Sequence, residues 1–400
     1  MKTQQLALLV VAGVALGGAG LYVRSRQAAG FQQSKASLGA PVLGKLDAST
    51  IQGLRITAGT NQLNLVKSGD NWTVQERGGY NANFASIQDF VRKLVDLKAT
   101  QPVSVGPSRL AALELTAPDK GPGVLVELLG ADGKASRSLL LGKKVNKESK
   151  GDDAFGGGSW PIGRYVQVDG KLDSIAMVNE VLANAEPKPD DWLEKDWIKV
   201  EQPVAVSVTH PAATNSFALI RTNEFASWSL ADAAPTEKLD TTKLGSFGTL
   251  LSSPSFDDVV VDPKEEALGF AGGTKAVVKT AAGWTYEFQV GKAQEADRYP
   301  FRFTVAAELA TQRVPGKDEK PEDKEKLDKE FAEKLKKQQD KLAAEKALSK
   351  WTFLTSRWSI DPFFKNRSEL FEDPKKDDSK PAAGGADAPV FTPPNLPGAN

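Results

Sequence analysis

The sequence predicts an α+β fold: two tandem copies of an antiparallel sheet packed with helices, one N-terminal transmembrane helix and an inserted charged helix. Three observations lead to this prediction. Short segments of alternating apolar and polar residues, bounded by glycine and aspartate turns, recur along the chain in two similar series. An uncharged apolar run opens the chain, and a highly charged run with helical spacing interrupts the second series.

Composition narrows the class of protein. A chain of 400 residues exceeds one typical core and indicates two domains with additional segments. Lys+Arg and Asp+Glu number 51 each, so charge gives no argument for nucleic acid, and none is expected as a partner. The chain has no cysteine and one histidine, His210, which excludes disulfides, thiolate nucleophiles, cysteine-based metal sites and histidine-rich metal sites. We therefore expect no cofactor and no metal.

The N-terminal apolar run predicts a signal-anchor over residues 1–26. It opens at Leu6, ends at Val23 and contains 18 uncharged residues. As a helix these residues rise about 27 Å, close to the ~30 Å hydrocarbon core of a bilayer. A cleaved signal peptide is the alternative, because residues 18–20 offer a small-x-small cleavage site. The run exceeds the 7–15 apolar residues of a usual signal peptide, which favours retention.

The flanking charges leave the orientation of the body open. Arg24 and Arg26 follow the apolar run, and a strict positive-inside count would keep the body in the cytoplasm. Long domains translocate largely regardless of such charges. We expect a single-pass protein of the bacterial inner (cytoplasmic) membrane whose body faces the periplasm.

The first series follows a linker at residues 27–45 and forms the first α+β repeat, residues 46–198. A helix is expected after Ser86 as N-cap, with Ile87, Phe90 and Leu94 on one face. A short helix is expected at 108–115 and a last helix at 172–185. The expected strands lie at 53–57, 62–66, 71–74, 102–105, 124–129, 137–141 and 164–168.

The second series repeats this order and forms the second α+β repeat, residues 199–372. Its strands are expected at 204–208, 217–221, 227–230, 259–261, 276–279 and 285–290, with one more after Tyr299. A common order with apolar positions in register favours tandem duplication over two unrelated α+β domains with similar turns. Three apolar helix positions keep an offset of 157 residues: Leu244, Phe247 and Leu251 follow Ile87, Phe90 and Leu94.

A charged helical insertion at residues 317–350 lies near the end of the second copy, between Val305 and Trp351, and the first copy lacks it. Of its 34 residues, eleven are basic and ten are acidic. The apolar stripe of Leu327, Phe331, Leu335 and Leu342 is thin, so the helix at 322–348 either docks on the second copy or projects as an interaction arm, and we favour the arm. The composition of the 373–400 tail predicts disorder. Four Glu→Lys pairs at i,i+4 are expected to support the helix: Glu322–Lys326, Glu325–Lys329, Glu330–Lys334 and Glu333–Lys337.

No set of residues predicts catalysis. A Ser-His-Asp arrangement would require His210, which we interpret as a surface histidine at a strand end. The paired acids Asp152-Asp153, Asp190-Asp191, Asp257-Asp258 and Asp377-Asp378 lack the alternating spacing of a calcium loop. We therefore assign no catalytic, cofactor-binding or metal-binding residue. The residues Trp160, Arg164 and Tyr165 offer either an edge that binds a protein partner or packing inside the sheet.

The order of these elements resembles the bacterial domain-of-unknown-function 4340 (DUF4340) family. The resemblance covers roughly residues 53–197 well and the second copy more loosely. Members look like single-pass, envelope-facing proteins, some encoded beside ABC-transporter genes of the gliding-motility type, and the family has no assigned catalytic residues. The features that carry the resemblance are residues 69–74, 112–118, 140–143, 164–166 and 192–196.

Three functions remain open at the level of sequence. The leading one is a non-enzymatic, membrane-anchored envelope protein that binds a protein partner, as an auxiliary component of an ABC-type transport or gliding-motility-like complex. The second is an extracytoplasmic module that binds a small molecule or glycan between the copies. The third is a carboxylate-based hydrolase.

Overall fold

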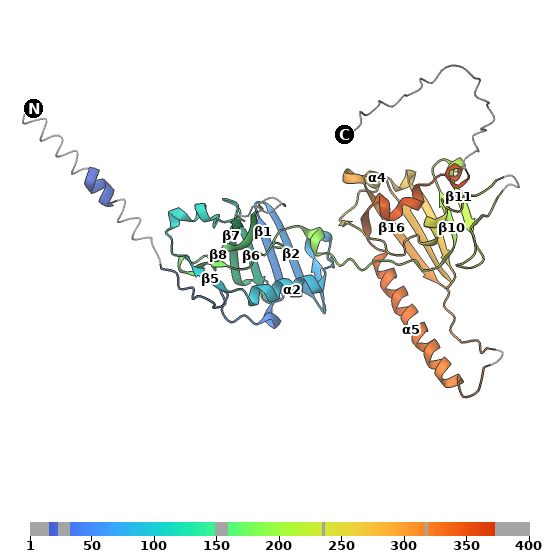
Figure 1. The fold of residues 1–400 in the computed structure, drawn as a ribbon, viewed down its shortest axis with the longest axis horizontal. Coiled ribbons are helices and arrows are strands. Elements are labelled where there is room, and N and C mark those ends of the chain that lie inside the picture. The colour runs from blue at the N-terminus through green and yellow to red at the C-terminus, as the bar shows by residue number, and fades with distance from the viewer. Residues whose placement is uncertain (1–15, 23–32, 149–158, 234–236, 317–318, 373–400) are drawn as a thin grey trace, which may run out of the picture.

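The computed structural model describes residues 16–22, 33–148, 159–233, 237–316 and 319–372. Figure 1 shows two sheet-containing units, the first coloured from blue to green and the second from green to red. Most of the expected anchor and the whole 373–400 tail lie outside the described residues; residues 16–22 are helical. Within the described ranges, no helix is both long and apolar enough to cross a membrane.

The first unit contains one nine-stranded sheet in which each pair of neighbouring strands is antiparallel. Its strand order is β4-β3-β2-β1-β6-β7-β8-β9-β5. The strands are β1 (Gly53–Ala58), β2 (Asn61–Ser68), β3 (Asn71–Val74), β4 (Tyr80–Asn81), β5 (Ala99–Pro102), β6 (Val124–Leu129), β7 (Ala135–Glu148), β8 (Ser159–Val168) and β9 (Ile175–Val178).

The second unit contains an eight-stranded antiparallel sheet in the order β12-β11-β10-β14-β15-β16-β17-β13. When the two-residue β4 is left aside, every strand of the first sheet has a counterpart at the same place in the second. The predicted α+β class with two antiparallel sheets is therefore confirmed. The strands are β10 (Pro203–Thr209), β11 (Phe217–Ile220), β12 (Ser229–Leu230), β13 (Asp258–Val260), β14 (Thr274–Thr280), β15 (Trp284–Val290), β16 (Arg298–Ala307) and β17 (Thr352–Ser356).

The helix α2 (Phe84–Val95) covers the first sheet. Its buried residues include Ile87, Phe90 and Leu94, as predicted from the helical spacing. The predicted N-cap was wrong by three residues. Asn83 occupies the cap, and its side-chain oxygen accepts a hydrogen bond from the backbone N–H of Ser86 at 2.8 Å, so Ser86 lies inside the first turn.

The corresponding place in the second unit holds only a four-residue helix, α3 (Gly245–Gly248). Leu244, Phe247 and Leu251 are all buried, but Leu251 has a φ of 51°, which no right-handed helix can include. The longer helix expected here was wrong because two glycines within four residues disfavour helix propagation. A 3-10 segment, Arg357–Phe364, covers part of the sheet that the longer helix was expected to cover, and it contacts β14 and β17.

The helix expected at residues 172–185 was also wrong. Residues Leu172–Ser174 form a single 3-10 turn, and β9 follows directly at Ile175–Val178. This strand pairs antiparallel with β8 on one side and β5 on the other, so cross-strand pairing overrides the local helical spacing. The strand expected at 102–105 was displaced, because β5 spans Ala99–Pro102. In place of the short helix expected at 108–115 there are two 3-10 turns, Pro107–Arg109 and Ala111–Leu113.

The described part of the expected linker packs on the first unit. The backbone N–H of Val42 donates to the carbonyl of Leu97 at 2.9 Å, and that of Gly39 donates to the carbonyl of Ala99 at 2.8 Å. Leu43 is buried in the core. Residues 33–44 therefore form a strap that belongs to the first unit.

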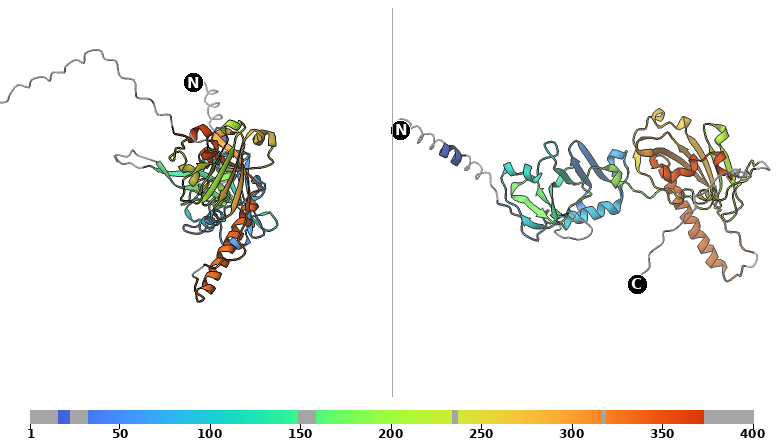
Figure 2. Two further views of the ribbon diagram at one scale, coloured as in Figure 1. Left: turned by 90° about the vertical axis from the view of Figure 1, so that its right-hand side faces the viewer. Right: turned by 45° about the horizontal axis from the view of Figure 1, so that its top comes forward.

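The charged insertion forms the helix α5 (Lys324–Leu348) between β16 and β17. In the first unit the same strands, β8 and β9, are joined by residues 169–174 alone. Figures 1 and 2 show α5 extending away from the second sheet. The two units thus differ most where one connection is short and the other carries a helix of 25 residues.

Candidate functional site

The most prominent feature of the second unit is the arm, which we define as α5 with the described segments before it, residues 308–316 and 319–323. The C-terminal turns of α5 form its root on the sheet, and the rest projects (Figures 1 and 2). Most side chains of the projecting part are exposed, and Leu327, Phe331 and Leu335 are half-buried. The predicted stripe is therefore present and covers only one side of the helix.

The root of the arm is fixed by a buried carboxylate. Glu345 is 3% exposed and accepts hydrogen bonds from the Tyr286 hydroxyl at 2.9 Å and from the backbone N–H of Lys199 at 3.2 Å. The Lys341 ammonium lies 3.8 Å from this carboxylate and 4.7 Å from the centre of the Trp284 ring. Burial raises the pKa of Glu345, although Lys341 and the two hydrogen bonds oppose that rise.

Ion pairs organise the projecting part. Of the four expected i,i+4 pairs, the described helix contains Glu325–Lys329, at 2.9 Å, while Lys326 lies 3.9 Å from Glu330. Arg313, in the segment before the helix, donates to Asp328 at 2.7 Å and also pairs with Glu319. The Arg313–Asp328 pair joins the segment before the helix to α5, and the other pairs lie within one of these two parts.

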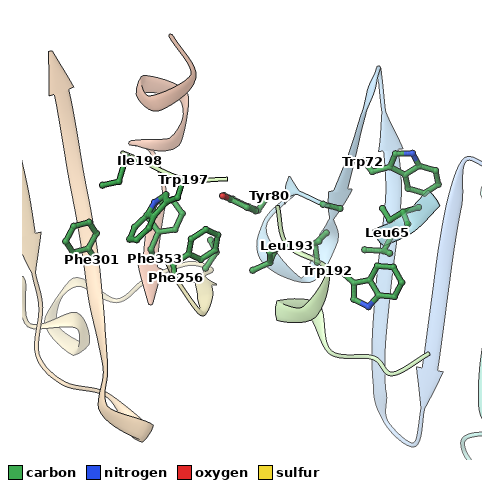
Figure 3. Close-up of a cluster of buried hydrophobic side chains, with 14 of the residues drawn as sticks. Leu65, Trp72, Tyr80, Trp192, Leu193, Trp197, Ile198, Phe256, Phe301 and Phe353 are labelled. Carbon is green, nitrogen blue, oxygen red and sulfur yellow. The ribbon is translucent and has the colours of Figure 1, made fainter. Parts of the chain in front are cut away.

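The second feature is the junction between the units, which sequence reasoning did not anticipate. Leu193 pairs with Ala82 in the first unit, and Trp197 packs in the second, so only residues 194–196 cross between them. Figure 3 shows Tyr80 pointing from the first unit toward the aromatic cluster of the second. Its ring makes edge contacts with Phe256, Trp351 and Phe353, with ring centroids 5.9, 5.3 and 6.1 Å away.

A salt bridge supports the same junction. The Arg77 guanidinium donates to both carboxylate oxygens of Asp258, at 2.5 and 2.7 Å, and this pairing raises the pKa of Arg77. Beside it, the Lys195 ammonium donates to the carbonyls of Phe256 and Asp257, and burial lowers the pKa of Lys195. Arg77 and Asp258 are 181 residues apart, and no local pattern indicates such a pair.

His210 and Asp258, two candidates for catalysis or metal binding, make contacts within the fold. His210 follows the end of β10, half-buried; its ring nitrogens lie 3.2 Å from the Thr274 hydroxyl and 2.9 Å from the carbonyl of Lys365. Asp258 is committed to Arg77, while Asp152-Asp153 and Asp377-Asp378 lie outside the described residues. The parts of the chain that the structure describes contain no group of three or more His, Cys, Asp or Glu that could hold a metal.

The three residues considered as a partner-binding edge differ in burial. They are Trp160, Arg164 and Tyr165. Arg164 is 6% exposed, and its guanidinium donates to the carbonyls of Gly142 and Val181. Burial lowers the pKa of Arg164 to about 10. The buried guanidinium cannot reach a partner. Tyr165 packs beside a small buried cluster, as the alternative interpretation held, and Trp160 stays 47% exposed on β8.

The fold and these features define a two-unit α+β protein with a repeated sheet and an arm on one copy. The chain belongs to the family described as Domain of unknown function (DUF4340), whose match covers residues 72–271. The match begins in β3 and ends inside the second unit, so it crosses the junction rather than stopping at residue 197. No curated protein and no solved structure matches the chain.

Proposed function

We propose that this protein is a non-enzymatic, membrane-anchored component of the bacterial envelope that binds a protein partner through the arm. The partner is a subunit of an ABC-type transport complex or of a gliding-motility-like complex. The apolar run between Leu6 and Val23 supplies the anchor, and the body faces the periplasm. The observation that carries the proposal is the projection of α5 beyond the sheet on which it is rooted.

The projecting part of α5 gains little stability from contacts with the rest of its own chain. At 1.5 Å per residue, the 25 residues of α5 extend about 38 Å, and packing on the sheet is confined to its last turns. Each exposed i,i+4 ion pair contributes only ~0.2–0.5 kcal/mol, and helices without tertiary packing are marginal in water. A partner that packs against the half-buried stripe of Leu327, Phe331 and Leu335 would supply the missing contacts.

The charge of the arm favours a protein surface over a polyanion. The insertion at 317–350 has eleven basic and ten acidic residues, so its net field is small. Mixed charges of this kind set orientation and specificity against a complementary protein surface. Nucleic acid would require an excess of basic residues.

The strap limits how far the first unit can lie from an anchoring segment. Nine residues, 24–32, separate Val23 from the strap, and fully extended they reach about 30 Å. The first unit would therefore stay close to the membrane surface, while the arm belongs to the second unit. This arrangement suits a periplasmic component that contacts the extracytoplasmic part of a membrane complex.

Photo-crosslinking from the arm tests the proposal. A photoreactive amino acid is placed at Glu333 or Lys337, both exposed on α5, and for comparison at Lys67 or Lys134, both exposed on the first unit. In native membranes we expect a discrete adduct from the arm positions alone, and mass spectrometry should identify a transporter or motility-complex subunit. Equal adducts from all four positions, or none from the arm, would contradict the proposal.

Anchoring and orientation need a separate test, because the arm could bind a partner in either compartment. Alkaline carbonate washing should leave the protein in the membrane fraction; release of a chain that begins after Gly20 would indicate a cleaved signal peptide. The chain has no cysteine, so Ser379→Cys introduces a unique thiol. This thiol should react with an impermeant reagent in intact spheroplasts, and labelling only after lysis would place the body in the cytoplasm.

A further inference from the structure

A cleft with a volume of about 540 Å³ lies beside the junction, at the root of the arm. Three parts of the chain line it: residues 79–81 of the first unit, residues of the 194–199 stretch at the crossing, and the end of α5 with Trp351. Both units and the arm therefore contribute to one concave surface, the kind of place where small ligands commonly bind.

Several polar groups of the cleft take no part in holding the fold. Asn81 and Asp196 are exposed, and their side chains make no hydrogen bond or ion pair with any described residue. Trp197 also lines the cleft, but its indole N–H is fully buried and faces no accessible surface. The two free side chains are therefore the polar groups of the cleft that a ligand can reach.

The remaining lining indicates the chemistry of the ligand. The Trp351 ring is half-buried, lies against Tyr80 at 5.3 Å between centroids, and gives the cleft an aromatic wall. Three carboxylates and three ammonium groups line the cleft, so it does not select a strongly charged molecule. These charged residues are Glu194, Asp196, Glu345, Lys199, Lys341 and Lys350.

We infer that the cleft binds a neutral hydroxylated ring of the saccharide class. The less polar face of such a ring packs against Trp351, and its hydroxyls donate to the Asp196 carboxylate and accept from the Asn81 amide. This binding site goes beyond the proposed function, because it uses the root of the arm and the junction and leaves the projecting part free.

The test titrates the purified full-length protein with glucose, N-acetylglucosamine, cellobiose and chitobiose. Trp197 and Trp351 line the cleft, so tryptophan fluorescence reports occupancy, and saturation-transfer NMR reports the bound sugar directly. We expect a saturable response to at least one of the four. Asn81→Ala and Asp196→Ala should each raise the Kd by about tenfold, because each removes a hydrogen bond to a polar group of the ligand.

Asp257→Ala is the matched control, since Asp257 is an exposed acid at the same junction that does not line the cleft. It should bind the sugar like the natural chain, and all three variants should keep the natural melting temperature. Failure of all four sugars to give a saturable response overturns the inference. Binding that is unchanged in both Asn81→Ala and Asp196→Ala also overturns it, because the sugar then binds elsewhere. Neither result bears on crosslinking from the projecting part of the arm, so failure here is separable from failure of the proposed function.

Discussion

The two units have the same strand order but cover and connect their strands differently. The first unit packs the 12-residue α2 on its sheet and joins β8 to β9 through a short turn. The second unit replaces α2 with four helical residues and a 3-10 segment, Arg357–Phe364, and places α5 between the strands equivalent to β8 and β9. The sheet thus acts as a common scaffold, and the connections distinguish the copies.

The cores of the two units reflect the same difference. In the second unit, stacked and tilted aromatic rings from β15, β16 and the 3-10 segment Arg357–Phe364 contact one another in the core. Phe288 contacts both Phe301 and Phe363, with centroids 5.4 Å away in each case. Aromatic side chains bury a large area each, so few residues of irregular backbone can seal the sheet. The second unit therefore has a closed core although α3 is only four residues long.

Truncation of the equivalent helix residues tests this comparison with the largest expected effect. Phe90 and Phe247 lie 157 residues apart and are both 0% exposed. Phe90→Ala and Phe247→Ala should each reduce the free energy of unfolding by about 3–5 kcal/mol, measured by urea denaturation. A loss at Phe247 well below 1 kcal/mol would break the equivalence, since it would mean that the short helix does not support the second core.

A pair of glycines tests the equivalence at the level of the backbone. A Cβ on Gly142 would collide with the carbonyl of Leu113, and a Cβ on Gly291 with the carbonyl of Leu268. Gly142→Ala and Gly291→Ala should each destabilise by about 1–3 kcal/mol, because the backbone must move. The control Gly245→Ala meets no atom within 4 Å and begins α3, so it should stabilise by about 0.4–1 kcal/mol. Loss at only one of the two glycines would show that the two positions are not equivalent.

The sequence predicts the repeated part of the fold better than the part that differs. Alternating residues and glycine turns locate most strands, and the 157-residue offset identifies buried positions such as Phe90 and Phe247 in both units. The same offset wrongly transfers a full helix to the second copy, because Leu251 is buried with a positive φ that no right-handed helix includes.

Long-range pairing explains what could not be predicted of the sites. Arg77, Tyr80 and Asp258 form the junction from segments that have no local pattern in common. Arg164 looked available to a partner because charged residues are usually exposed, yet two backbone carbonyls hold it in the interior. The helix of the arm, by contrast, follows from local composition. The predicted helix, 322–348, begins two residues before the observed helix and ends at the same residue.

The contact between the units gives a smaller expected effect. The side chains of Arg77 and Asp258 are 21% and 15% exposed, so their pairing is only partly screened by water. A double-mutant cycle with Arg77→Ala and Asp258→Ala should give a coupling energy of about 1 kcal/mol in urea denaturation. Coupling indistinguishable from zero would mean that this ion pair does not help to hold the two units together.

The pH dependence of the root of the arm gives the smallest effect. Because burial raises the pKa of Glu345 above 4.5, its contribution to stability is present at pH 4.5 and is lost as the pH rises through the folded-state pKa. Glu345→Gln stays neutral and should be more stable than the natural chain at pH 8, with the difference shrinking toward pH 5, in thermal unfolding. A difference that instead grows as the pH falls would show that Glu345 is held ionised by Lys341.

Hydrogen exchange along α5 tests the central claim that the second unit carries a projecting, partner-binding arm. In the purified protein, amides of residues 324–338 should exchange fast, while those of residues 339–348, held by the buried Glu345 and the half-buried Leu342, should exchange slowly. In native membranes that contain the partner, exchange of residues 324–338 should slow. Strong protection along the whole helix in the purified monomer, unchanged in membranes, would contradict the account and make α5 an ordinary part of the second unit.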